Sequence, residues 1–156
     1  MRKILVLGAL FLTFNIANAQ NNVIKANPLG LAFGIANAGY EFTTTGSQTA
    51  TISGIYFDVL GINGGGIGAE YRFYFDGEAI KGWHAGPSLG YLSLSDDFNS
   101  SASVFSFGAE IGHQWIFGES FALDIFAGYG AVTGGDDLSG LSSSASSIGL
   151  AIGYAW

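Results

Sequence analysis

The chain alternates between apolar and polar or small residues with a period of two, in segments of about ten residues separated by Gly, Asp, Asn and Ser. Such alternation is typical of β-strands, because successive side chains point to opposite faces. The pattern predicts eight strands, at about residues 23–33, 36–44, 50–58, 65–75, 82–94, 103–117, 120–132 and 145–155. Pro28 and Gly30 interrupt the first strand. Residues 27–30 therefore either continue the regular hydrogen-bonded ladder of the strand or form a kink at a strand edge.

The alternation divides each strand into a large apolar face and a face of small or ionisable residues. The predicted strand 65–75 shows this division clearly. One face carries Ile67, Ala69, Tyr71, Phe73 and Phe75, and the other carries Gly66, Gly68, Glu70, Arg72 and Tyr74. The last two predicted strands divide in the same way.

The composition decides which face points outward. Hydrophobic residues make up 49% of the chain and charged residues only 11%, and there are 25 glycines. A lipocalin-like soluble barrel would turn its charged face to water, but here the second face has too little charge for that role. We therefore assign it to a narrow lumen, which small side chains fill in an eight-stranded barrel. The predicted fold is all-β: an eight-stranded antiparallel up-and-down transmembrane β-barrel without a wide pore.

The amino-terminal residues form a separate segment. Two basic residues precede an apolar run, and Ala17-Asn18-Ala19 is a small-x-small cleavage site. The alternative is a membrane anchor, but the apolar run is shorter than the roughly 20 residues that a spanning helix needs. We predict a cleaved signal peptide at residues 1–19 and a barrel domain at residues 20–156.

Charge and cysteine content exclude several classes of function. Without residues 1–19, the cations are Lys25, Arg72 and Lys81, against twelve acidic residues, so the net charge is 3 − 12 = −9. Nucleic acid is therefore not an expected partner, because phosphate binding depends on Lys and Arg. The chain has no cysteine and hence neither a disulfide framework nor a thiolate metal site. We expect no cofactor.

The last strand ends in a pattern of small and apolar residues. Its five positions resemble the carboxy-terminal targeting signal of bacterial outer-membrane β-barrels: Ser147, Gly149, Ile152, Tyr154 and Trp156. In an up-and-down barrel this strand closes against the first. The barrel assembly machinery of the outer membrane is then an expected partner.

The connections and the tryptophans predict how the barrel is oriented. Residues 45–49, 76–81 and 118–119 are expected as short periplasmic turns, and residues 58–64, 96–101 and 133–144 as longer outer loops. Both termini would then be periplasmic. Trp83, Trp115 and Trp156 fall at strand ends on this side, so we predict that they form a periplasmic aromatic girdle. Chance placement of the three is the alternative.

The stretch from Asn21 to Trp156 resembles small Gram-negative outer-membrane barrels of the OmpA-like superfamily. Its opening, with Ile24-Lys25, Asn27-Pro28-Leu29-Gly30, Phe33-Gly34 and Gly39-Tyr40-Glu41, resembles uncharacterised barrels of Bacteroidetes. The resemblance implies a monomer whose partners are outer-membrane lipid and lipopolysaccharide. It identifies no surface ligand.

Ionisable residues on the lumen face are the main candidate site. They are Glu41, Glu70, Arg72, Glu110 and Asp124, with His84 nearer the periplasm. One interpretation is an ion-pair network that closes the barrel, because buried charges normally pair. The other is a narrow conduit or receptor for a small solute or cation, because the acids outnumber the arginine.

An enzyme is the less favoured class, although some similar barrels modify lipid A with His and Ser. His84 and Ser88 share a face, but four strand residues separate them by about 13 Å. His113 lies on the apolar face, and Trp115 occupies the position where a His-x-Ser motif needs serine. We predict no catalytic residue and no enzymatic activity.

The predicted loops offer a weaker metal candidate. Asp96-Asp97 and Asp136-Asp137, with nearby Asn and Ser oxygens, suit either calcium binding or simple solubilisation of loop tips. Neither pair has the spacing of a calcium loop, so no metal site is predicted. Gly64-Gly65-Gly66-x-Gly68 lacks the helix and lysine of a phosphate loop and is predicted as a flexible turn that enters a strand.

Overall fold

The computed structural model describes residues 21–59, 61–96, 101–134 and 143–156. The predicted signal peptide at residues 1–19 lies outside this part of the chain. So do Asp97 and the Asp136-Asp137 pair of the predicted loops. Among the described residues, no helix is both long and apolar enough to cross a membrane.

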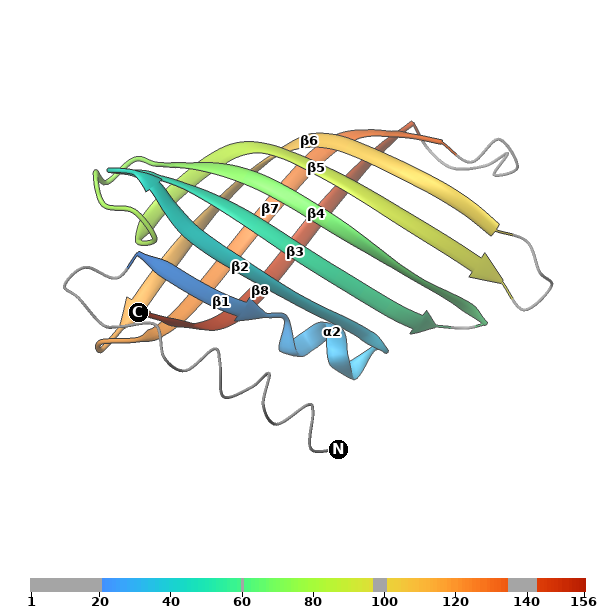
Figure 1. Ribbon diagram of the computed structural model, residues 1–156, viewed down its shortest axis with the longest axis horizontal. Helices are drawn as coiled ribbons and strands as arrows, with labels where there is room; N and C mark the ends of the chain where they lie inside the picture. Colours follow the sequence, from blue (N-terminus) through green and yellow to red (C-terminus); the bar gives the residue numbers. More distant parts are fainter. Residues whose placement is uncertain (1–20, 60, 97–100, 135–142) are drawn as a thin grey trace.

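Eight antiparallel strands, each paired with its neighbours in sequence, close into a barrel (Figure 1). This confirms the predicted eight-stranded up-and-down architecture. The strands are β1 (Asn22–Ala26), β2 (Ile35–Thr45), β3 (Gln48–Val59), β4 (Ile62–Tyr74), β5 (Gly82–Asp96), β6 (Ser101–Phe117), β7 (Phe121–Thr133) and β8 (Ser144–Ala155). Seven of them match the predicted ranges to within three residues, because alternation continues almost to each turn.

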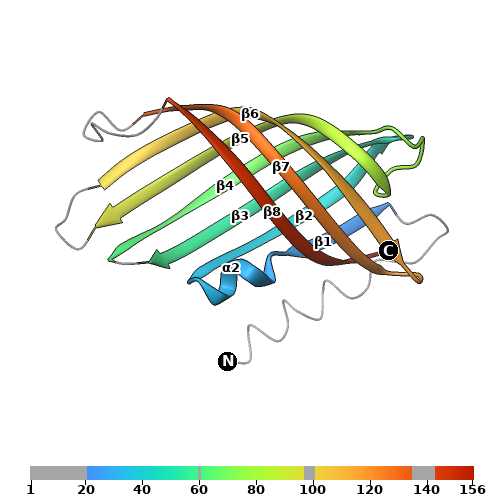
Figure 2. The same ribbon diagram turned by 180° about the vertical axis from the view of Figure 1, so that it is seen from behind.

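The first and last strands join to close the barrel, as Figure 2 shows. Val23 to Ala26 pair with Ile152 to Ala155. The backbone N–H of Trp156 donates to the carbonyl oxygen of Asn22 at 3.0 Å, and the N–H of Asn21 donates to the carbonyl of Trp156 at 2.9 Å. We call this end of the barrel the terminal end and the opposite end the loop end.

The first predicted strand, 23–33, is wrong beyond residue 26. β1 stops at Ala26, and a short helix, α2 (Pro28–Ala32), follows and contacts β2 and β8. Asn27 caps the helix, because its Oδ1 accepts a hydrogen bond from the N–H of Gly30 at 3.0 Å. Pro28 has no N–H for a ladder, yet its fixed φ suits the first turn of a helix.

Loss of the Asn27 cap should weaken the barrel modestly. Asn27→Ala is expected to lower the free energy of unfolding by about 1 kcal/mol, because the N–H of Gly30 loses its acceptor. Asn27→Ser retains a capping oxygen and should stay near the wild-type value. Urea unfolding of the refolded barrel in detergent, followed by tryptophan fluorescence, measures both. Equal losses in the two variants would mean that the cap is not what Asn27 contributes.

The two faces of the strands differ as predicted, with one exception. In β4, Ile67 is 69% exposed and Arg72 only 3%. However, the inward face is not made only of small or ionisable residues, because Phe57, Leu92 and Phe126 also point into the lumen. Each of them lies against a glycine of the neighbouring strand, in the pairs Phe57–Gly64, Leu92–Gly66 and Phe126–Gly149. A narrow barrel takes large inward side chains where small ones face them.

This pairing also changes the interpretation of the glycine run. Gly64, Gly65 and Gly66 lie within β4 rather than in a flexible turn. A Cβ on Gly64 would stand 2.7 Å from the ring of Phe57, and one on Gly66 would stand 2.8 Å from the side chain of Leu92. Gly64 and Gly66 therefore make room for large lumen residues.

Candidate functional site

An apolar plug closes the lumen at the terminal end. Ile80, from the connection between β4 and β5, is buried against inward residues of three strands: Val23, Ala122 and Ala155. Its backbone has a φ of 61°, which is unusual for a β-branched residue. The carbonyl of Ile80 accepts a hydrogen bond of 2.7 Å from Nε2 of Gln114, which ties the connection to β6.

Directly above the plug, Lys25 joins three strands through its ammonium group. Nζ donates to Glu41 Oε2 at 2.7 Å, to Asp124 Oδ2 at 2.9 Å and to Gln114 Oε1 at 2.9 Å. Glu41, Asp124 and Gln114 are completely buried. All three ammonium hydrogens can therefore be satisfied, as burial of a charge requires.

Arg72 connects this group to the remaining acids. Its Nη1 lies 2.6 Å from Asp124 Oδ2 and 3.6 Å from Glu41 Oε2. Its Nη2 lies 2.7 Å from Glu70 Oε2 and 3.2 Å from Glu110 Oε1. The five lumen residues singled out from the sequence thus meet around one guanidinium group.

Neutral side chains complete the network. Tyr74 and Thr49 each donate a hydrogen bond of 2.7 Å to Glu41 Oε1. Nε2 of His84 lies 3.0 Å from Asp124 Oδ1, and the imidazole is fully buried. The sequence reasoning missed Lys25, Thr49 and Gln114 as members. For Lys25 a signal existed, since it alternates with the exposed Ile24 and shares the inward face with Val23.

The layer formed by these residues leaves no room for water at its centre. Glu41, His84, Gln114 and Asp124 have no accessible surface, although they come from four different strands. Above them, towards the loop end, the lumen contains a cavity of about 170 Å³. Its lining includes Ser88, Ser106, Glu110, Gly128 and Ser147, together with apolar residues such as Val132 and Ala145.

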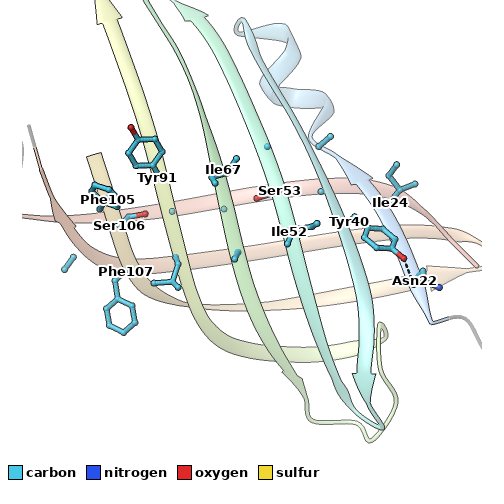
Figure 3. Close-up of a pocket in the computed structure, with 18 of the residues that line it drawn as sticks. Asn22, Ile24, Tyr40, Ile52, Ser53, Ile67, Tyr91, Phe105, Ser106 and Phe107 are labelled. Carbon is cyan, nitrogen blue, oxygen red and sulfur yellow. Dashed lines mark hydrogen bonds between the residues drawn. The ribbon is translucent and has the colours of Figure 1, made fainter. Parts of the chain in front are cut away.

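The outside of the barrel is apolar all the way round. Every strand contributes at least one exposed large residue, for example Ile24, Tyr40, Ile52, Ile67, Leu89, Phe107, Ile125 and Ile148. A broad apolar hollow follows this belt, and Figure 3 shows part of its lining. Because most of its large lining residues are exposed and alternate with buried inward ones, the hollow belongs to the outer surface rather than to the lumen.

One family of proteins of unknown function, DUF3575, matches residues 4–137, a range that includes β1 to β7. The chain belongs to the DUF3575 family. No curated protein and no solved structure matches it.

The three tryptophans of this DUF3575 barrel all lie at the terminal end. His113 stands between Trp83 and Trp115, with ring centroids 5.1 and 4.2 Å away. Trp156 stacks on Tyr40 and Tyr154, each at 6.1 Å. The aromatic residues therefore form two clusters, and their role as a membrane girdle stays a prediction.

The residues of the predicted targeting signal occupy β8 of the DUF3575 barrel. Ser147 and Gly149 face the lumen, whereas Ile152 and Tyr154 face outward and are exposed. Trp156 follows the strand directly. Recognition of this strand by an assembly machinery also stays a prediction.

The candidate catalytic groups are not assembled in the DUF3575 barrel. His84 contacts Asp124 of β7 rather than Ser88 of its own strand, and His113 lies outside between two indole rings. Within the described ranges, no three His, Asp or Glu side chains are arranged to hold a metal ion.

Proposed function

We propose that this DUF3575 protein is an outer-membrane β-barrel with a structural or surface-interaction role and no wide pore. The observation that carries the proposal is its inverted polarity. Large apolar side chains form the exposed face of all eight strands, while Lys25, Glu41, Arg72 and Asp124 are buried inside. A barrel in water would have the reverse arrangement, and a continuous exposed apolar surface of this kind suits contact with lipid chains.

The remaining expectations follow from this proposal. Lipid and lipopolysaccharide would surround a monomer, and the assembly machinery would insert it with both termini in the periplasm. The aromatic residues at the terminal end would then lie at the periplasmic interface of the outer membrane. We assign no enzymatic activity and no cofactor to the protein.

The closed interior supports the structural role over a narrow conduit. The apolar plug and the fully buried layer of Glu41, His84, Gln114 and Asp124 block the lumen at the terminal end. The cavity of about 170 Å³ lies on one side of this layer only. On this proposal, a small solute would enter the cavity from the loop end without crossing the barrel.

Two measurements test the proposal. Full-length protein produced in a Gram-negative host should appear in the outer-membrane fraction and migrate differently on a denaturing gel before and after boiling, because a closed barrel resists detergent. In planar bilayers the purified protein should give no discrete conductance steps. Recovery in the soluble periplasm would contradict the membrane assignment, and reproducible conductance steps would favour the conduit.

A further inference from the structure

The lumen holds more negative than positive charge. Within the described part of the chain, the network contains four carboxylates, from Glu41, Glu70, Glu110 and Asp124. Two cations, Lys25 and Arg72, oppose them. The acidic groups therefore outnumber Lys25 and Arg72 by two inside a narrow barrel, where an unpaired charge is costly.

The excess charge is concentrated on Glu70 and Glu110. Glu41 and Asp124 each contact both Lys25 and Arg72. In contrast, Glu70 and Glu110 share a single nitrogen, Nη2 of Arg72. Both carboxylates therefore lie against one arm of the guanidinium group, and no other Lys or Arg of the described residues forms an ion pair with them.

Among the described residues, two buried oxygen atoms, one on Glu70 and one on its ladder partner, have no hydrogen-bond partner. They are Oε1 of Glu70, on a side chain that is 10% exposed, and Oγ1 of Thr51. Thr51 on β3, Glu70 on β4 and Ser88 on β5 are consecutive partners in one ladder row. The two orphaned oxygens thus come from adjacent strands and belong to the same layer of the lumen. Buried polar atoms without partners are uncommon and indicate that something else satisfies them.

The cavity of about 170 Å³ adjoins this row at Ser88. Glu110 lines it together with the hydroxyl-bearing Ser88, Ser106 and Ser147. Its volume exceeds what a single water needs, so an ion with several of its own waters fits. Ser106 and Ser147 are exposed, which gives solvent access to the cavity. The polar side-chain atoms that line the cavity are all oxygens.

We propose that the lumen binds one divalent metal cation between Glu70 and Glu110, with the hydroxyls of Thr51 and Ser88 and water as further ligands. Oxygen donors of this kind suit a hard cation such as Ca²⁺, which takes carboxylates, neutral oxygens and water together. One divalent ion also balances the two excess negative charges. A site with only two carboxylates binds more weakly than one that encloses the ion in charged ligands.

Calcium binding to the refolded full barrel tests this site. Decalcified protein in detergent is titrated with Ca²⁺ by isothermal calorimetry, and the unboiled gel shift shows that each variant is closed. We expect one saturable site in the wild type. Glu70→Gln and Glu110→Gln should weaken the binding by about tenfold or more, since losing even an indirect ligand contact can cost that much. Thr51→Val, which keeps the shape of the side chain, should weaken binding less.

A loop variant separates this site from the aspartate pairs in the connections. In that control, Asp96, Asp97, Asp136 and Asp137 are all changed to Asn, and we expect its lumen affinity to match the wild type. The absence of saturable binding would overturn the proposal, as would binding that only the loop variant loses. If Glu70→Gln stabilises the barrel while the wild type binds no Ca²⁺, the pair shares a proton instead. Membrane location is measured by fractionation and by the gel shift. A lack of Ca²⁺ binding would therefore overturn this site without contradicting the proposed function.

Discussion

Asp124→Asn is expected to lower the free energy of unfolding of the barrel by about 3–5 kcal/mol, because it leaves buried cations without their shared partner. Oδ2 of Asp124 is bonded to Lys25 at 2.9 Å and to Arg72 at 2.6 Å, while Oδ1 contacts His84. The amide has nearly the same shape but no charge, so packing is preserved and electrostatic compensation is lost. The loss of stability should therefore measure the ion-pair network rather than the cost of leaving a cavity.

Urea unfolding of the refolded protein in detergent measures the loss, and Glu78→Gln provides the control. Glu78 also forms an ion pair, with Lys81 at 3.7 Å, but both side chains are more than half exposed. Exposed pairs of this kind contribute about 0–1 kcal/mol. A similar small effect at Asp124 would show that water reaches the network and that the lumen is not closed at this level.

A double variant distinguishes the network from the isolated side chain. Lys25→Met removes the ammonium group that contacts Glu41, Gln114 and Asp124. If Lys25 and Asp124 act through each other, the loss in Lys25→Met/Asp124→Asn should be smaller than the sum of the two single losses. Strict additivity would indicate that the two residues stabilise the barrel independently.

Alternation alone was enough to locate much of this network. Glu70 and Arg72 lie two residues apart on the small face of β4, so the period of two places them inward without knowledge of the fold. The contact between Arg72 and Asp124 is different. It joins β4 to β7 across the lumen, over 52 positions of sequence, and depends on the diameter and stagger of the barrel. No local pattern encodes that distance.

The errors at the first strand have a common local cause. Asn27 and Pro28 start a helix by capping and by a fixed φ, and these effects override the alternation that continues beyond them. Lys25 lies near the end of this shortened strand and is absent from the lumen residues predicted from the sequence. The inward position of Ile80 was equally hidden, since a β-branched residue with positive φ in a turn carries no sequence signal.

Ile67→Arg should prevent stable insertion of the barrel into lipid, with a loss of about 2–4 kcal/mol in folding free energy. Ile67 is 69% exposed on the outer face of β4, opposite Gly54 of β3 and Tyr91 of β5. Ile52 and Leu89, which are also exposed, lie opposite the next outward residue of β4, Ala69. If the belt contacts lipid chains, the guanidinium group must leave water to occupy this position. The cost is greatest near the middle of the membrane and decreases towards its interfaces.

Phe75→Arg is the matched control for the membrane assignment. Phe75 is also highly exposed and continues the same alternation, but it lies just beyond the end of β4 at the terminal end. Near an interface the same change should cost only about 0–1 kcal/mol. Folding into lipid vesicles at increasing urea concentration, read from the unboiled gel shift, compares the two variants. A barrel that folds in water would tolerate both changes equally, because Arg at an already exposed position loses no hydration. Equal folding of the two variants would therefore contradict the proposed outer-membrane location, whereas a loss confined to Ile67→Arg places the apolar belt in lipid.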